Sequence, residues 1–299
     1  MPGPGDVLTK KKISQTGSRF RSALEILAIT LLAALFLKFL IVEAYLIPTS
    51  SMENTLMAGD FVLVNKFVYG AQTPRYVPYT TIALPHIRFP AIFSPRRGDV
   101  VVFEFPEKPG DDRPHEVVNL VKRCIGLPGD TLAIINRVVT VNGKEVLMPP
   151  TARADRALMY PRGLRDNDIF PRGTDFNEDN FGPLVIPRSG NEVDLTLGNV
   201  SEYWDLIQRE GHTIVTNASG IFIDGEPARH YRMQKDYYFM LGDNRDNSLD
   251  SRFWGFVSAD LIIGKAFMVY WSWDENQSPS GFLSHLLSAR WNRIGTIVK

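Results

Sequence analysis

Ser51 is the residue whose setting first suggests chemistry. It lies in residues 46–52 (LIPTSSM), a hydroxyl-rich segment directly after the longest apolar run of the chain. A serine hydroxyl there could act as a nucleophile on a substrate that is presented at a membrane surface. The alternative is structural, because Ser50 and Glu53 fit a capping box, which would make this segment only the start of a helix.

A serine nucleophile needs a base that accepts its proton. No histidine lies in a motif typical of hydrolases, and the G-x-S-x-G elbow is absent. The remaining candidate is a lysine, which is neutral only where burial lowers its pKa. Lys122 fits because residues 119–125 form a largely apolar strand, and adjacent Arg123 would lower the pKa further by like-charge repulsion. The alternative is an edge-strand charge that faces solvent.

The composition excludes several classes of protein. The chain has 299 residues, a formal net charge of zero and 44% hydrophobic residues, which suffices for one or two folded domains. A nucleic-acid-binding protein usually has a clear basic excess. The single cysteine, Cys124, excludes an intramolecular disulfide and a cysteine-rich zinc site, and the five histidines form no ligand pair. We therefore expect no metal, no cofactor and no nucleic-acid partner.

These candidate residues must be positioned by other elements, and the first is a predicted transmembrane anchor over residues 22–43. About 20 helical residues span ~30 Å, the thickness of a bilayer core. Residues 1–21 form a basic tail, so the positive-inside rule predicts a single pass through the plasma (cell inner) membrane. The N-terminus would be cytoplasmic and the catalytic domain would lie on the outer, periplasmic face. The alternative is a cleaved signal peptide, but Lys38 interrupts the apolar run and favours a retained anchor.

Most of the remaining sequence has the composition of β-strands. Asn142-Gly143 and Asp224-Gly225 stand between β-branched and aromatic residues, so each predicts a hairpin with a type I′ turn. The sequence thus predicts a mainly β fold with an antiparallel catalytic core. The principal strands are expected at residues 61–69, 99–105, 117–125, 237–241 and 261–271.

Residues 147–211 differ in character from the strands around them. They are rich in Pro, Arg, Asp and Asn, with one predicted helix at residues 200–210. We interpret this segment as an inserted second lobe. The catalytic β core would then comprise residues 44–146 and 212–299.

The C-terminal tail, residues 282–299, places Leu283, Leu287, Trp291 and Ile294 at helical spacing. This pattern predicts an amphipathic helix, which could pack on the core or lie at a membrane interface.

Four motifs taken together resemble those of bacterial type I signal peptidases, and they occur in that family's order. The motif at residues 242–255 is long and unusual in composition, so a chance match is hard to credit. Residues 147–211 contain no matching motif. The four are residues 47–56 (IPTSSMENTL), 97–103 (RGDVVVF), 121–130 (VKRCIGLPGD) and 242–255 (GDNRDNSLDSRFWG).

The resemblance implies a Ser/Lys dyad in which Ser51 is the nucleophile and Lys122 the general base. Ser248 would hold the lysine amine by a hydrogen bond. Thr49 would supply its hydroxyl to the oxyanion hole, beside the backbone N–H of Ser51.

The resemblance also implies structural roles and a substrate pocket. Asp250 and Arg252 would form an ion pair that fixes their turn, and Asp243 and Asn244 would be turn residues. Shallow apolar pockets for small side chains would be built from Ile47, Met52, Val121, Met240 and Leu241.

Three features depart from the family's pattern. Asn54 stands where the family commonly has proline, one span is predicted where some members carry two, and a cysteine pair of some members is missing.

The expected function is that of a membrane-bound serine endopeptidase that removes N-terminal signal peptides from exported precursor proteins. It would cut after small residues through an acyl-enzyme. Its expected partners are precursors that carry signal peptides and the lipid bilayer, with the export translocon as a further candidate. A self-cleaving Ser/Lys repressor would carry a DNA-binding module in place of the span. The alternative from another class is a catalytically inactive, membrane-anchored β-domain that acts as a binding or assembly factor.

Overall fold

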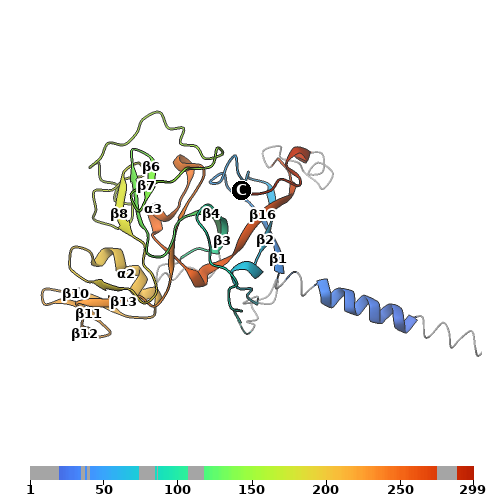
Figure 1. The fold of residues 1–299 in the computed structure, drawn as a ribbon, viewed down its shortest axis with the longest axis horizontal. Helices are drawn as coiled ribbons and strands as arrows, with labels where there is room; N and C mark the ends of the chain where they lie inside the picture. Colours follow the sequence, from blue (N-terminus) through green and yellow to red (C-terminus); the bar gives the residue numbers. More distant parts are fainter. Residues whose placement is uncertain are drawn as a thin grey trace, which may run out of the picture.

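The computed structural model describes residues 20–34, 38, 41–73, 85, 87–106, 118–274 and 288–299. The described chain is mainly antiparallel β-sheet, as the sequence predicts, and a helix at residues 20–34 extends away from the β body (Figure 1).

The central sheet has seven strands, and each pairs with its neighbours in antiparallel direction. The predicted strand at residues 61–69 is shorter than expected. The Asn65 side chain accepts a hydrogen bond from the backbone N–H of Val68 at 3.3 Å, a local bond that competes with the strand, and a 3-10 turn follows (η2, Phe67–Tyr69). In spatial order the strands are β1 (Val42–Leu46), β2 (Asp60–Asn65), β16 (Ile262–Ser272), β3 (Val100–Glu104), β4 (Asn119–Gly126), β14 (Tyr237–Leu241) and β15 (Val257–Ser258).

This sheet curls, which brings strands that are distant in the order close together. One apolar cluster contains side chains from β2, β16, β3 and β4, and also Ile47 from the loop after β1. Register shifts in β16 mark bulges, which bend a strand and increase its twist. At Gly264 a Cβ atom would lie 2.5 Å from the carbonyl oxygen of Asn65, so only glycine allows this close crossing. Because of this curvature, the end of β1 and the loop after it lie close to β4, and Ile47 and Val121 belong to the same apolar cluster.

A four-stranded sheet packs beside the first one. Asn142 and Gly143 have φ values of 52° and 75°, which confirms the predicted tight hairpin. The last strand comes from the segment interpreted as a lobe, so its pairing with β5 crosses the predicted boundary at residue 147. The order is β7 (Lys144–Glu145), β6 (Val138–Val141), β5 (Thr131–Ile135) and β8 (Phe181–Val185).

Smaller elements complete the part of the molecule that lies farthest from the N-terminal helix in Figure 1. The predicted helix at residues 200–210 is confirmed as α2 (Val200–Arg209), which buries Leu206 and Ile207 against the core. Asp224 and Gly225 have φ values of 51° and 88°, as the second predicted hairpin requires. The strands here are β10 (Ile214–Asn217), β11 (Gly220–Ile223) and β12 (Glu226–Pro227) in one sheet, and β13 (His230–Arg232) with β9 (Glu192–Asp194) in another.

The described part of the tail, residues 288–299, is not the predicted amphipathic helix; Leu283 and Leu287 lie outside the described residues. It forms a short 3-10 turn, η5 (Trp291–Arg293), and its backbone pairs with the end of β16 through Arg290 N–H to Ser272 O at 2.9 Å. Backbone pairing with a long strand has overridden the helical spacing. The other short helices are η3 (Arg245–Asn247), α3 (Ser251–Trp254) and η4 (Ala259–Leu261).

The predicted anchor at residues 22–43 coincides only partly with the structure. The N-terminal helix covers residues 20–34, residues 35–37 and 39–40 lie outside the described chain, and Val42 and Glu43 already belong to β1. No helix in the described ranges has both the length and the hydropathy required to cross a bilayer.

Candidate active site

Ser51 lies on the connection between β1 and β2, in a series of turns that we call the Ser51 turn (residues 49–56). The capping-box interpretation is wrong, because no helix starts here. The backbone N–H of Glu53 donates to the carbonyl of Ser50 at 3.0 Å. The Ser50 hydroxyl accepts a hydrogen bond from Asn247 at 2.8 Å instead of capping a helix.

Lys122 points from β4 to the nucleophile. Its Nζ lies 2.6 Å from Ser51 Oγ, and only 3% of Lys122 and 8% of Ser51 is exposed to solvent. The two residues are 71 positions apart in the sequence. The curl of the central sheet closes this separation, because it places the loop after β1 over β4.

The buried position of Lys122 changes its acidity. Burial lowers the pKa of Lys122 from its ordinary value of 10.5 to about 8, while the carboxylates of Asp250 and Asp243 act in the opposite direction. Repulsion from Arg123, which was expected from the sequence, is not among the causes of the lowered pKa of Lys122. Neighbours on a strand face opposite sides, and the Arg123 guanidinium is paired with Asp243.

Asp243 holds an ionic network beside the dyad, so it is more than the predicted turn residue. Both of its carboxylate oxygens accept hydrogen bonds from Arg123, at 2.8 Å and 2.6 Å. The Thr55 hydroxyl donates to the same carboxylate at 2.5 Å. Asp243 is fully buried, and loss of one partner from such a pair typically costs about 3–5 kcal/mol. The network therefore fixes the end of the Ser51 turn against β4.

We call residues 242–250, which follow β14, the Ser248 turn. Ser248 Oγ is buried and has no hydrogen-bond partner among the described residues, so its predicted bond to the lysine amine stays a prediction. Gly242 is required by close approach: a Cβ atom there would lie 2.1 Å from Ser248 Oγ and 2.7 Å from the carbonyl oxygen of Ser51. The absence of a side chain at Gly242 thus allows Ser248 to pack beside the nucleophile.

The predicted ion pair between Asp250 and Arg252 is present. Arg252 Nε and one terminal nitrogen each donate to Asp250 at 2.9 Å, and both side chains are almost fully buried. Asp250 also caps α3, where its side chain accepts from the backbone N–H of Arg252. The pair fixes the junction between the Ser248 turn and α3.

Thr49 and Asn54 flank the nucleophile. The Thr49 hydroxyl lies 3.3 Å from Ser51 Oγ, and its part in an oxyanion hole stays a prediction. Asn54 has a φ of 72°, which the proline that is common at this family position cannot adopt. The Ser51 turn therefore has a local backbone path that suits asparagine, whose amide donates to the carbonyl of Thr151 at 3.2 Å.

The residues predicted to form one substrate pocket are divided among three apolar clusters. Ile47, Met52 and Val121 share the cluster inside the curled sheet. Met240 and Leu241 are adjacent in β14, so their side chains face opposite sides and join two other clusters. The first three share one cluster, and neither Met240 nor Leu241 belongs to it.

The sequence interpretation missed Arg153 and the contacts that Asn244 and Glu53 make around the dyad. Asn244 donates its backbone N–H to the carbonyl of Ser51 at 3.1 Å, and its side-chain amide donates to the carbonyl of Ser50 at 3.2 Å. Glu53 forms an ion pair with Arg153 at 2.5 Å. Among the described residues no group of His, Cys, Asp and Glu side chains could hold a metal ion.

The arrangement supports one chemistry, a serine hydroxyl activated by a buried amine. Comparisons of the chain with known proteins identify relatives of one kind. A family model described as signal peptidase, peptidase S26, matches residues 20–271. Signal peptidase I of Pseudomonas aeruginosa is 32% identical over 277 residues, which cover 89% of this chain and 75% of the relative.

Two further matches are also proteins described as signal peptidase I. Signal peptidase I of Aquifex aeolicus is 33% identical over 257 residues, which cover 82% of each chain. A solved signal peptidase I from Enterococcus faecalis aligns with 58% of this chain and 98% of its own length, at 20% identity and a TM-score of 0.31. From the extent of the family match and the identity to these relatives, the chain belongs to the signal peptidase family, peptidase S26.

Proposed function

We propose that this chain is a serine endopeptidase that removes signal peptides from precursor proteins, with Ser51 as nucleophile and Lys122 as general base. Membership of the signal peptidase family supports the activity. The observation that carries the residue assignment is the 2.6 Å contact between Lys122 Nζ and Ser51 Oγ in a buried setting. This contact gives no support to a catalytically inactive binding domain.

The proposed reaction has two steps. Neutral Lys122 accepts the proton of Ser51 Oγ as that oxygen attacks the carbonyl carbon of the scissile peptide bond. The resulting tetrahedral oxyanion would be stabilised by the Ser51 N–H and the Thr49 hydroxyl. The protonated lysine then donates its proton to the departing amine. Lys122 then accepts a proton from the water that attacks the acyl-enzyme, and returns it to Ser51 Oγ as the bond between that oxygen and the acyl group breaks.

The substrate preference follows from the apolar cluster beside the nucleophile. Ile47 and Met52 are almost fully buried there and Val121 is partly buried. These three residues would line the shallow apolar pockets for small side chains that the family resemblance implies. We expect cleavage after Ala or Gly and little or none after Phe or Leu, since one extra methylene in a tight pocket is worth ~1–3 kcal/mol. The measurement is kcat/KM on synthetic precursors that differ only at the residue before the cut. Efficient cleavage after Phe would contradict the proposal.

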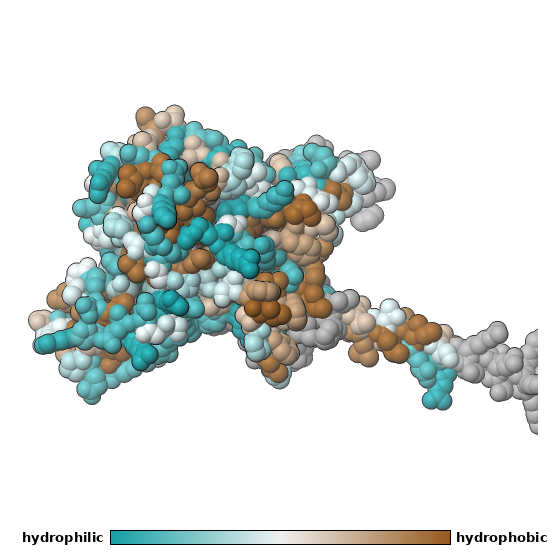
Figure 2. Space-filling model, viewed as in Figure 1, coloured by the Kyte–Doolittle hydropathy of each residue, from teal (hydrophilic) through white to brown (hydrophobic). Residues whose placement is uncertain are grey.

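Attachment to the membrane is part of the proposal. Figure 2 shows apolar residues on the N-terminal helix and on the part of the body nearest to it. Phe67, Ile92 and Phe93 are each more than half exposed, and Phe93 is hydrogen-bonded to the backbone of η2, so these residues lie together. Such a surface favours contact with lipid. A single pass through the inner membrane, a cytoplasmic N-terminus and a periplasmic catalytic domain remain our inference from the sequence, as does an association with the translocon.

One experiment tests activity and orientation in the same cells. A precursor should be cleaved by cells with the wild-type chain and left intact by cells with the Ser51→Ala variant. External protease, added after the outer layers are opened, should remove a tag placed after residue 299 and leave a tag at residue 2 intact. Loss of the tag at residue 2 would overturn the proposed orientation, and the proposed activity would be unaffected by that result.

A further inference from the structure

A segment of the lobe, residues 151–156, contacts both the Ser51 turn and the Ser248 turn; we call it the strap. Its backbone bonds to the Ser248 turn on both sides of Asn244. The N–H of Arg153 donates to the carbonyl of Asp243 at 2.8 Å, and the N–H of Arg245 donates to the carbonyl of Arg153 at 2.9 Å. The strap is therefore bonded to the first half of the Ser248 turn.

The strap also contacts the Ser51 turn through side chains. The Thr151 hydroxyl lies 2.6 Å from the hydroxyl of Thr55. Since the Thr55 hydroxyl donates its proton to Asp243, Thr151 is the donor in this contact. Arg153 donates to the Glu53 carboxylate at 2.5 Å. With the Asn54 amide, which donates to the carbonyl of Thr151, three consecutive residues of the Ser51 turn are thus bonded to the lobe.

Glu53 is the point at which three segments meet. One carboxylate oxygen accepts hydrogen bonds from Arg153 of the strap and from the side-chain amide of Asn244, at 2.5 Å and 3.2 Å. The same amide and the backbone N–H of Asn244 hold the carbonyls of Ser50 and Ser51. The position of Arg153 is therefore transmitted, through Glu53 and Asn244, to the backbone of the nucleophile.

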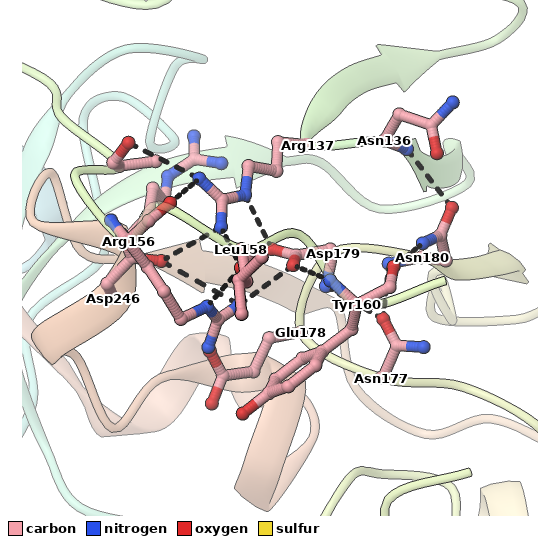
Figure 3. Close-up of polar contacts among 12 residues, drawn as sticks. Asn136, Arg137, Arg156, Leu158, Tyr160, Asn177, Glu178, Asp179, Asn180 and Asp246 are labelled. Atoms are coloured by element: carbon pink, nitrogen blue, oxygen red, sulfur yellow. Dashed lines mark hydrogen bonds and ion pairs between the residues drawn. The ribbon is translucent and has the colours of Figure 1, made fainter. Parts of the chain in front are cut away.

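The far end of the strap is fixed by a cluster of charges, which Figure 3 shows around Arg156. The Arg156 guanidinium bonds to Glu178 at 3.0 Å and to Asp179 at 2.8 Å, and Asp179 also accepts from Arg137 at 2.9 Å. The backbone N–H of Arg156 donates to Asp246 of the Ser248 turn at 2.7 Å. A strap that is fixed at one end by ion pairs within the lobe can resist movement at the other.

We propose that residues 147–211 position the nucleophile, and that Arg153 is the positioning residue that does so through Glu53. This inference rests on the proposed function. Arg153 bonds neither to Lys122 nor to Ser51 directly, so its loss should shift the nucleophile without changing the acidity of the base. A misplacement of about 1 Å can cost on the order of 100-fold in rate. We therefore expect Arg153→Ala to lower kcat by about tenfold, with KM within about twofold and the acid-limb pKa unchanged.

The test compares five variants of the full chain with the wild type, in detergent and on one synthetic precursor. Arg162→Ala is the matched control, because Arg162 is an exposed arginine of the same lobe. Glu53→Ala should lower kcat at least as much as Arg153→Ala, since it removes the Asn244 contact as well. The double variant should be no slower than Glu53→Ala by more than about twofold, because residues that act as one unit are not additive. Arg153→Lys, which keeps a cationic donor, should recover part of the rate.

The outcomes separate the two proposals. The wild-type chain is also treated with an acylating inhibitor of serine proteases. If it neither cleaves the precursor nor forms a covalent adduct on Ser51, the proposed function is defeated. Active wild type and Arg162→Ala with an equally active Arg153→Ala would overturn only the positioning role. Losses that multiply in the double variant, or an effect on KM alone, would overturn it too. If Arg153→Ala does not unfold cooperatively, it is not a folded protein and Arg153→Lys is used in its place. A lowered kcat with an unchanged KM in Arg153→Lys would support the positioning role of Arg153, and an unchanged kcat would overturn it.

Discussion

Ser51→Ala and Lys122→Ala are each expected to lower kcat/KM for precursor cleavage by at least roughly 10⁴-fold, and the double variant is expected to be no slower than either single one. The hydroxyl and the amine are 2.6 Å apart and both are buried, so neither can be replaced by water in the same geometry. Without the Ser51 hydroxyl the Lys122 amine has no proton to accept, and without the amine the hydroxyl has no base. The free-energy losses should therefore coincide instead of adding.

The measurement is single-turnover cleavage of a synthetic precursor in detergent, with the midpoint of urea unfolding recorded for each variant. Ser219→Ala and Lys144→Ala are matched controls, because both residues are exposed on turns or edges of the β sheets. Both controls should retain wild-type rates. Losses that multiply in the double variant would show that Ser51 and Lys122 do not act together.

The dyad was predicted from short motifs of the sequence, and the resemblance of these motifs to a known family is what assigns their roles to Ser51 and Lys122. Lys122 lies in a largely apolar strand at residues 119–125, and the Ser51 segment carries a motif of its own. The same holds for the hairpins, where Asn142-Gly143 and Asp224-Gly225 supply the positive φ values that a tight turn requires. Each of these features depends on residues that are close together in the chain.

The support around the dyad was not predictable, because it depends on pairs that are distant in the chain. Asp243 has the composition of a turn residue, and its burial against Arg123 becomes visible only when β14 is seen to pair with β4. The contact of Arg153 with Glu53 joins residues 100 positions apart. The helical spacing of the tail was misleading for the same reason, since pairing with β16 decides its conformation.

The pH dependence of cleavage is the second large effect. An ordinary lysine is charged at neutral pH and cannot accept a proton from a serine hydroxyl. Burial lowers the pKa of Lys122 to about 8, because the interior disfavours the ammonium more than Asp250 and Asp243 stabilise it. The base is active when neutral, so kcat/KM should rise about tenfold per pH unit well below that pKa and reach a plateau above it.

The same proton equilibrium contributes to stability with a defined sign. The unfolded chain holds the Lys122 proton up to its ordinary pKa of 10.5, whereas the folded chain releases it near pH 8. Between these two values the unfolded state binds more protons, so this group should raise the free energy of unfolding as the pH increases. Below the lower value both states are protonated, and the contribution no longer changes. The contribution is measured by urea unfolding of the wild type and of Lys122→Met at several pH values between 8 and 10.5. If the free energy of unfolding changed with pH equally in the two proteins, the pKa of Lys122 could not be shifted.

Lys122→Arg distinguishes a proton acceptor from a mere positive charge. A guanidinium stays protonated throughout the accessible range, so the variant should be inactive at every pH, even where the wild type is on its plateau. A histidine base would give an acid limb near its ordinary pKa of about 6.5, well below the value expected for Lys122. The profiles of His115→Ala and His230→Ala should therefore overlay that of the wild type. If the acid limb disappeared in either histidine variant, or if Lys122→Arg recovered activity at high pH, Lys122 could not be the base, and the contact with Ser51 would have to be structural.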